Sequence, residues 1–226
     1  MRIGGLQKFS LIDFPGKMAA VVFTQGCNFR CGYCHNPQLV LADRFQKLIP
    51  EEEVFDFLKR RQGTLEGVVV TGGEPTLQKD LMPFLRRIKG FNFAVKLDTN
   101  GSHPLVLERI VKERLVDYIA MDVKAPLADY EKVAVAKVAA ADIQKSIQLI
   151  VESGIPYEFR TTLIKALCPE SKIPELFAAI PQARRYILQP FIASKEILDE
   201  KLLSEEHYSP VEIATLKTRW ERDSYR

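Results

Sequence analysis

The chain has 226 residues, of which 46% are hydrophobic and 27% are charged, and its formal net charge is +3. This composition excludes a disordered protein, and the length suits one globular domain. A small net charge without a basic block argues against nucleic-acid binding. No apolar run reaches the roughly 18 residues that cross a membrane, and the N-terminus lacks a signal-peptide layout. We therefore expect a cytoplasmic protein that partners neither nucleic acid nor a membrane.

Strand-like and helix-like segments alternate along the chain, which predicts repeated βα units and a mainly parallel sheet. Six strands are expected, at 18–24, 67–71, 93–97, 118–123, 157–162 and 186–189. Helices are expected at 81–88, 143–151 and 211–222, and another from Pro50, where three glutamates fill the first turn. Such an α/β series forms a doubly wound sheet or a complete or partial barrel. In both cases ligands gather at the C-terminal ends of the strands.

Three of the four cysteines lie in one short segment directly after the first predicted strand. Cys27, Cys31 and Cys34 have the spacing Cys-x3-Cys-x2-Cys, so that one loop can place three thiolates around a single metal centre. Structural zinc sites use four protein ligands and ordinary cubane clusters use four cysteines. Three ligands therefore leave one corner of the centre open to an exogenous ligand, which indicates reactivity.

Two other interpretations of this loop stay open. One is a zinc or structural site completed by Cys168 or His35, although Cys168 is distant in sequence and His35 directly follows Cys34. The other is a cluster that only transfers electrons, which would need a fourth cysteine. A disulfide framework is disfavoured because cytosolic thiols stay reduced and such close neighbours cannot all pair.

Three further polar segments follow predicted strands. In Gly72-Gly73-Glu74-Pro75 the two glycines would let the backbone approach a ligand closely. Asp98-Thr99-Asn100-Gly101 can hydrogen-bond a ribose or a carboxylate, although Asn-Gly is also a common turn pair. In Met121-Asp122-Val123-Lys124 the charged residues Asp122 and Lys124 share one face, because residues two apart in a strand do so; a surface ion pair is the alternative.

The cysteine loop, with Tyr33 directly before the last cysteine, resembles the signature of the radical S-adenosylmethionine superfamily. The resemblance implies a partial (β/α)6 barrel of that type. It also implies a 4Fe–4S cluster on Cys27, Cys31 and Cys34, whose unique iron binds the amino and carboxylate groups of S-adenosylmethionine. In that scheme the backbone of Tyr33 meets the adenine, and Glu74 helps to bind the methionine ammonium group.

The order of the motifs resembles one group within that superfamily, the activating enzymes of glycyl radical enzymes. Residues 10–16, SLIDFPG, followed by FTQGC, resemble the stretch that those activases carry before the cluster, with Phe14 in place of their glycine. The HNP sequence at 35–37 also resembles them. The resemblance covers most of 1–191 and is greatest to the longer form of anaerobic ribonucleoside-triphosphate reductase activating proteins. We expect a single domain, 1–226, with an accessory tail at about 192–226.

The same resemblance implies further roles around the ligand. Asp98, Thr99 and Asp122 resemble positions that hold a monovalent cation beside the ligand carboxylate. Arg160 resembles a basic residue that faces the carboxylate of S-adenosylmethionine. Gln189, in the sequence Gln-Pro-Phe, would close the last strand beneath the adenine.

The implied activity is that of an oxidoreductase. Flavodoxin or ferredoxin would reduce the cluster, and S-adenosylmethionine would be cleaved to methionine and a 5'-deoxyadenosyl radical that removes the Cα hydrogen of a glycine on the partner. Asp13 is expected to contact that glycyl loop. Cys168, the only cysteine outside the motif, is expected to be a packed residue, so that one cluster is present.

Anaerobic ribonucleotide reductase is the favoured partner, and another glycyl radical enzyme such as pyruvate formate-lyase is the alternative. A small-molecule radical enzyme resembling 7-carboxy-7-deazaguanine synthase ranks lower. That family tends to show a glutamine-glycine-glutamate stretch before the cysteine loop, where this chain has IDFPG at 12–16.

Overall fold

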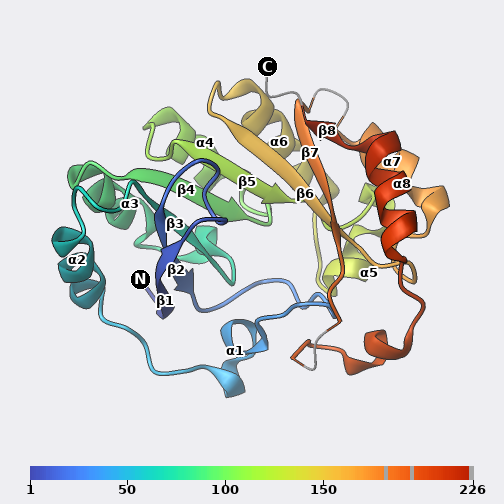
Figure 1. The fold of residues 1–226 in the computed structure, drawn as a ribbon, viewed down its shortest axis with the longest axis horizontal. Helices are drawn as coiled ribbons and strands as arrows, with labels where there is room; N and C mark the ends of the chain where they lie inside the picture. Colours follow the sequence, from blue (N-terminus) through green and yellow to red (C-terminus); the bar gives the residue numbers. More distant parts are fainter. Residues whose placement is uncertain (181–182, 194–195, 224–226) are drawn as a thin grey trace.

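Eight β-strands form one sheet and lie in it in sequence order (Figure 1). The structure is a computed structural model that describes residues 1–180, 183–193 and 196–223. The strands from β2 to β7 run parallel, whereas β1 and β8 are antiparallel to their neighbours at the two edges. The strand bounds are β1 Ile3–Ser10, β2 Ala19–Thr24, β3 Gly67–Gly72, β4 Ala94–Thr99, β5 Tyr118–Asp122, β6 Tyr157–Leu163, β7 Arg185–Pro190 and β8 Arg222–Asp223.

The sheet is a partial barrel. Within the described residues β1 and β8 form no ladder with each other, so the sheet stays open. All six predicted strands are confirmed as β2 to β7, with bounds that differ by two residues or fewer. The two edge strands were not predicted. β1 contains two glycines and several half-buried or exposed positions, and β8 has only two residues, so neither shows the apolar run of a buried strand.

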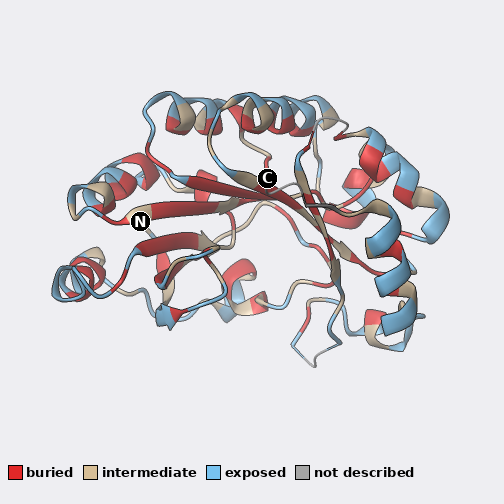
Figure 2. Ribbon diagram, turned by 45° about the horizontal axis from the view of Figure 1, so that its top comes forward, coloured by how far each residue is buried: buried red, intermediate tan, exposed pale blue. Residues whose placement is uncertain are grey.

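Helices cover the outer face of the sheet, and Figure 2 shows their buried stripes turned toward the strands. The α-helix bounds are α1 Pro37–Val40, α2 Glu51–Arg60, α3 Leu81–Gly90, α4 Pro104–Lys112, α5 Tyr130–Ala134, α6 Ala140–Glu152, α7 Ile173–Ala178 and α8 Pro210–Trp220. The four predicted helices are confirmed as α2, α3, α6 and α8. Among the described residues, we find no helix with both the length and the apolar character needed to cross a bilayer.

Helix α2 illustrates how the sequence specifies these outer elements. Pro50 is its N-cap, and the three glutamates of its first turn lie at the positive end of the helix dipole. Lys59 and Arg60 occupy the last turn, where a positive charge is favourable. Its buried face includes Phe55, whose ring lies 4.9 Å from that of Phe84 in α3. The helix is therefore fixed by its charged ends and by its apolar face.

The two faces of β2 contribute to different apolar clusters. Ala20 and Val22 belong to the main core between sheet and helices, whereas Val21 faces the barrel interior, because successive side chains of a strand alternate. The interior cluster also contains Phe14 and Tyr118, whose ring centroids are 6.0 Å apart. Phe14 comes from the turn between β1 and β2, so this turn fills the N-terminal end of the barrel.

The C-terminal segment packs on the same core as the barrel. Ile213 and Leu216 of α8 are buried in the main apolar cluster, and Leu202 joins it from the segment before that helix. A capping box holds the start of α8, because the Ser209 hydroxyl accepts from the Glu212 backbone N–H and the Glu212 carboxylate accepts from the Ser209 backbone N–H. The segment after β7 does not continue the alternation of strands and helices, but it is packed on the core.

Replacing Phe14 by alanine should lower the free energy of unfolding of the apoprotein by about 3 kcal/mol or more, because the ring is 2% exposed and its removal leaves a cavity at the barrel end. Urea unfolding followed by circular dichroism measures the change. Ile12→Ala is the matched control in the same turn, since its side chain is 89% exposed and should change stability by no more than about 0.5 kcal/mol. Equal effects of the two substitutions would contradict the packing described.

Candidate functional site

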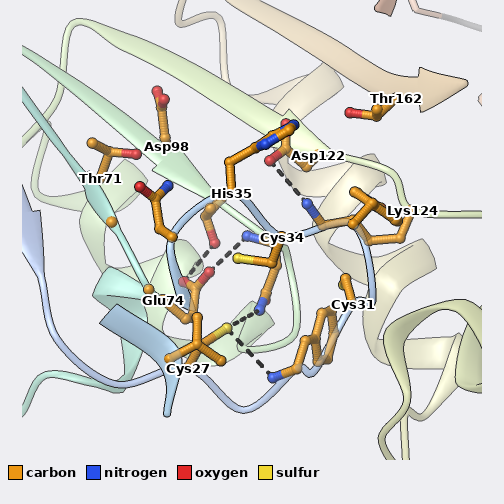
Figure 3. A pocket seen from close by; sticks show the side chains of 18 residues that line it. Cys27, Cys31, Cys34, His35, Thr71, Glu74, Asp98, Asp122, Lys124 and Thr162 are labelled. Carbon is orange, nitrogen blue, oxygen red and sulfur yellow. Dashed lines mark hydrogen bonds and ion pairs between the residues drawn. The ribbon is translucent and has the colours of Figure 1, made fainter. Parts of the chain in front are cut away.

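A cavity opens at the C-terminal ends of the parallel strands, beside the loop that follows β2 (Figure 3). Most of the predicted site residues line it: Cys27, Cys31, Tyr33, Cys34, Gly72, Gly73, Glu74, Asp98, Thr99, Asn100, Asp122 and Lys124. Thr71 and Thr162 also line it and were not predicted. Both lie at or near the C-terminal end of a strand, which is the one sequence signal that pointed to them.

Backbone hydrogen bonds fix the loop that carries the three cysteines. The Gly26 N–H donates to the Leu39 carbonyl at 2.8 Å, which ties the start of the loop to α1. The Arg30 N–H donates to the Ala134 carbonyl at 2.8 Å. Between these anchors the Cys34 N–H donates to the Cys31 carbonyl at 2.9 Å and forms a tight turn. Within the loop the Phe29 N–H also donates to the Cys27 sulfur at 3.4 Å. The path of the loop is therefore fixed mainly by backbone hydrogen bonds.

The three cysteines of the loop meet at the cavity as free thiols. All three line one cavity, and all four cysteines of the chain are free thiols. Burial raises the pKa of Cys27 to about 12 and also raises that of Cys31, so these thiols are protonated until a metal centre displaces the protons. In the part of the chain described, no three histidine, cysteine or acidic side chains are gathered at metal-binding distance.

The two glycines of the GGEP turn allow a close approach to the start of the cysteine loop. Gly72 has φ of +112°, and a side chain there would lie 2.4 Å from the Thr24 nitrogen. A side chain on Gly73 would lie 2.1 Å from the Gly26 carbonyl oxygen. The Glu74 N–H donates to that same oxygen at 2.8 Å. The glycines thus pack the turn against the backbone beside Cys27, in addition to lining the cavity.

The Glu74 carboxylate is fully buried and joins the ends of two strands. It accepts from the Thr76 N–H at 3.0 Å and from the Thr76 hydroxyl. From the end of β4 it accepts from the Thr99 hydroxyl at 2.8 Å and from the Asn100 N–H at 2.7 Å. Burial raises the pKa of this carboxyl, and the hydrogen bonds offset only part of that rise. Glu74 therefore connects the turn after β3 to the end of β4 beside the cavity.

Asn100 connects the end of β4 to the cysteine loop. Its side-chain amide donates to the Asn28 side-chain oxygen at 2.9 Å, and its own side-chain oxygen accepts from the Ser102 N–H at 2.9 Å. Asn28 in turn donates to the Ser102 hydroxyl at 2.9 Å. The Asp98–Gly101 segment therefore holds the loop of Cys27 in place as well as facing the cavity.

A charged pair lies on the other side of the cavity. The Lys124 ammonium group is 3.0 Å from Asp122 (Figure 3). It also lies over the Tyr33 ring, 5.9 Å from the centroid. Burial alone would raise the pKa of Asp122, but the charges of Arg160 and Lys124 outweigh burial and lower it. Asp122 is therefore an anion, and the surface ion pair considered from the sequence is instead an ion pair at the cavity.

Four residues singled out in the sequence lie away from the cavity lining. Arg160 sits deeper in the barrel, on the interior face of β6, and Gln189 is on β7. Asp13 is in the turn at the opposite end of β2 from Cys27, where it accepts from the Ser10 hydroxyl, so its placement gives no support to a contact at the cavity. Cys168 is 3% exposed and accepts at its carbonyl from the Tyr208 hydroxyl, as expected of a packed residue.

The C-terminal segment covers part of the cysteine loop. The Asp199 N–H donates to the Gly32 carbonyl at 2.8 Å, and Leu202 packs so close to Gly32 that a side chain there would touch it at 3.0 Å. The ring of His35 stacks on Phe191 with centroids 5.7 Å apart. The contacts from Asp199 and Leu202 come from a part of the chain in which the sequence showed no motif.

A family model described as the Radical SAM superfamily matches residues 21–171, two thirds of the chain. The chain belongs to the radical SAM superfamily. S-adenosylmethionine and a 4Fe–4S cluster are the cofactors of this family. Cys27, Cys31 and Cys34, on a single loop, line one cavity and carry the sulfur atoms that bind iron in such clusters. The family assignment confirms the resemblance read from the cysteine loop and from the turn at Gly72.

Curated relatives narrow the assignment. A protein of Methanocaldococcus jannaschii, named as a glycyl-radical enzyme activating enzyme, is 34% identical over 207 residues, which span 88% of this chain and 83% of that protein. The pyruvate formate-lyase-activating enzyme of Streptococcus mutans is 27% identical over 203 residues, which span 84% of this chain and 76% of that enzyme. This radical SAM protein is therefore a member of the glycyl-radical enzyme activating enzymes.

Solved structures confirm the fold. SuiB of Streptococcus suis bound to S-adenosylmethionine superposes with a TM-score of 0.66 at 15% identity. The superposition covers 85% of this chain but only 44% of SuiB, so SuiB carries much more than the part shared with this chain. The partial barrel predicted from the sequence is thus the fold that the radical SAM enzymes use.

Replacing Gly73 by alanine should displace the cysteine loop, because its new side chain would collide with the Gly26 carbonyl. We expect a loss of more than about 1 kcal/mol in the stability of the apoprotein and less iron bound after anaerobic reconstitution. Gly90→Ala is the matched control, since nothing lies within 4 Å of a side chain there. Urea unfolding and iron analysis measure the two effects. Full iron loading of Gly73→Ala would contradict the close approach.

Replacing Leu202 by alanine should loosen the C-terminal segment over the cysteine loop, because truncation of a buried leucine costs about 2 kcal/mol or more. The reconstituted variant should then lose its cluster absorbance several-fold faster in air. Val211→Ala is the control in the same segment, since that side chain is 76% exposed. If Leu202→Ala bleached at the control rate, the segment would not protect the loop.

Proposed function

We propose that this chain cleaves S-adenosylmethionine reductively and uses the 5'-deoxyadenosyl radical to remove a hydrogen atom from the Cα of a glycine in anaerobic ribonucleotide reductase. One electron enters and breaks a sulfonium carbon–sulfur bond, giving methionine and the radical. The radical then takes the glycine hydrogen to become 5'-deoxyadenosine, and a glycyl radical remains on the partner. The single observation that carries the proposal is the convergence of the three cysteines with the GGEP turn and the polar ends of β4 and β5 on one cavity.

The chain's own residues bind and orient the ligand in this proposal. Cys27, Cys31 and Cys34 would hold the cluster, which when bound supplies the electron to S-adenosylmethionine. The backbone at Tyr33 would meet the adenine, and the backbone of the Gly72–Glu74 turn would lie beside the methionine part. The Glu74 carboxylate already accepts hydrogen bonds from Thr76, Thr99 and Asn100. It would bind the methionine ammonium group in addition to these bonds.

Other assigned contacts remain proposals. Asn100, Asp98 and Lys124 line the cavity and would bind polar atoms of the ligand directly. Arg160 and Gln189 do not line the cavity. Arg160 would act on the ligand from deeper in the barrel, and Gln189 would act on it from β7.

The choice of partner rests on the order of motifs along the chain, which is most similar to activating proteins of anaerobic ribonucleotide reductase. Similarity to pyruvate formate-lyase-activating enzymes over 84% of the chain supports the alternative partner, pyruvate formate-lyase. Flavodoxin or ferredoxin is proposed as the electron donor and the cytoplasm as the location. We also propose that 1–226 acts as one domain with an accessory tail at 192–226, in which 194–195 and 224–226 lie outside the described residues.

The proposal predicts a glycyl radical doublet in the electron paramagnetic resonance spectrum. The reconstituted protein is incubated anaerobically with S-adenosylmethionine, a strong reductant and, in separate samples, anaerobic ribonucleotide reductase or pyruvate formate-lyase. The doublet should form on the reductase and should vanish with Cys31→Ala. Cys168→Ala is the matched cysteine control and should keep the doublet, because Cys168 is buried away from the cavity.

The other outcomes separate the parts of the proposal. A doublet on pyruvate formate-lyase alone would replace the proposed partner. Accumulation of 5'-deoxyadenosine without a doublet on either enzyme would reject both partners and retain the cleavage of S-adenosylmethionine. Absence of both products would reject the proposed activity.

A further inference from the structure

Five charged side chains from β4, β5 and β6 meet inside the barrel, directly below the cavity. Lys96 and Asp98 share the interior face of β4, because residues two apart lie on one face of a strand. Asp122 ends β5, Lys124 follows it, and Arg160 is paired in register with Asp122 on β6. The structure thus brings three cations and two carboxylates together from three strands, the outermost of which, β4 and β6, contribute residues more than sixty positions apart.

Each of the four carboxylate oxygens in this group has its own cationic partner. The Lys96 Nζ lies 2.7 Å from Asp98 Oδ1, and Arg160 Nη2 lies 3.3 Å from Asp98 Oδ2. On the other carboxylate, Arg160 Nε lies 2.8 Å from Asp122 Oδ1, and Lys124 Nζ lies 3.0 Å from Asp122 Oδ2. Arg160 therefore bridges the two carboxylates, and a lysine closes each end.

The positive charge in this group exceeds the negative charge. Three cationic side chains face two carboxylates. Glu158 approaches Arg160 at 3.7 Å, but it also accepts from the Tyr118 hydroxyl at 3.0 Å and pairs with Arg185 at 3.3 Å. Including Glu158 and Arg185 leaves the balance at four positive and three negative charges. Among these paired side chains the positive charges therefore outnumber the negative ones, and the buried Glu74 carboxylate lies beside them, bonded to Thr99 and Asn100.

Lys96 is the unexpected member of the group. Its side chain is only 2% exposed, in the middle of a strand whose neighbours Val95 and Leu97 are fully buried. Lysine is almost never buried unless its charge is paired, because leaving water costs the ammonium group a large solvation energy. The pairing with Asp98 at 2.7 Å meets that requirement. The fold therefore places the positive charge of Lys96 beside Asp98.

This arrangement does not fit the monovalent cation that the resemblance implies at Asp98, Thr99 and Asp122. An alkali ion is held by oxygen ligands of negative charge, and each of the four carboxylate oxygens here already has a cationic side chain as its partner. The Thr99 hydroxyl donates to Glu74 and accepts from the Gly101 N–H at 3.1 Å. A further cation would also lie beside three cationic side chains, in surroundings where like charges repel more strongly than in water. Asp98, Thr99 and Asp122 are therefore already bonded to other groups of the protein.

We propose that Lys96, together with Arg160, supplies as fixed side-chain charge the positive charge that a monovalent cation would otherwise supply, so that this chain binds S-adenosylmethionine without an alkali ion. Lys96 is a positioning residue in this proposal. It holds Asp98, which lines the cavity, and does not itself touch the ligand. The part of the proposal that concerns the ligand rests on the proposed function, whereas the part that concerns the cation does not.

The first test uses the wild-type apoprotein and holoprotein in buffers of equal ionic strength that contain potassium, sodium or tetramethylammonium chloride. The melting temperature of the apoprotein should be the same in all three buffers. The Kd for S-adenosylmethionine of the reconstituted protein should also be unchanged. Thallium NMR of the apoprotein should detect no bound ion. A bound thallium ion, or a Kd that weakens about tenfold or more without potassium, would overturn the proposal.

The second test uses Lys96→Met, which keeps the length of the side chain and removes its charge. This variant should gain a cation response: potassium should raise its melting temperature, and its Kd for S-adenosylmethionine should weaken about tenfold without potassium and recover with it. Lys96→Arg should behave as the wild type. Lys89→Met is the matched control, because Lys89 pairs with Asp117 at the same 2.7 Å but on the outer surface.

The outcomes distinguish this proposal from the proposed function. If Lys96→Met folds but shows no response to potassium and no change in affinity, Lys96 does not replace the ion and the proposal is wrong. If Lys96→Met does not fold, the wild-type measurements still decide the question. Failure to form a glycyl radical would reject the proposed function alone, because the apoprotein measurements do not depend on activity.

Discussion

The buried carboxylate of Glu74 is the constraint on which the site depends. It joins the turn after β3 to the end of β4, while its backbone N–H holds the Gly26 carbonyl beside the cysteine loop. An unpaired carboxylate at this depth would be very costly, so its donors must stay in place. The cysteine loop, the GGEP turn and the end of β4 are therefore positioned as one unit, and the geometry offered to a cluster follows from that unit.

The barrel interior consists of three layers, an apolar end, a charged middle and the cavity. Its N-terminal end is apolar and closed by Phe14, and its middle contains the paired charges of Lys96 and Arg160. Its C-terminal end opens into the cavity with the three cysteines. Charges buried in the middle layer are tolerated because each is paired. The charges of Arg160 and Lys124 lower the pKa of Asp122 at the floor of the cavity. An anionic ligand group there would lie near the ammonium group of Lys124.

The short motifs of the sequence meet beside one cavity in the fold. The cysteine loop, the GGEP turn and the ends of β4 and β5 were all located correctly beside one cavity, because parallel strands bring their C-terminal ends to one edge of a sheet. Lys96 was missed, although a lysine between Val95 and Leu97 in a buried strand is a visible signal. The cover over the cysteine loop by Leu202 was missed as well, since it involves no motif.

The sequence by itself determined the six parallel strands and the superfamily, because apolar periodicity and cysteine spacing are local properties of the chain. Only the tertiary structure decided which charges meet. The carboxylates of Asp98 and Asp122 are able to bind a ligand, a metal ion or a side chain. In the folded chain they pair with Lys96, Lys124 and Arg160. The fold also placed Asp13 far from Cys27, at the other end of β2. Such pairings depend on strand register and on which face each residue occupies, and these are fixed only when the sheet is assembled.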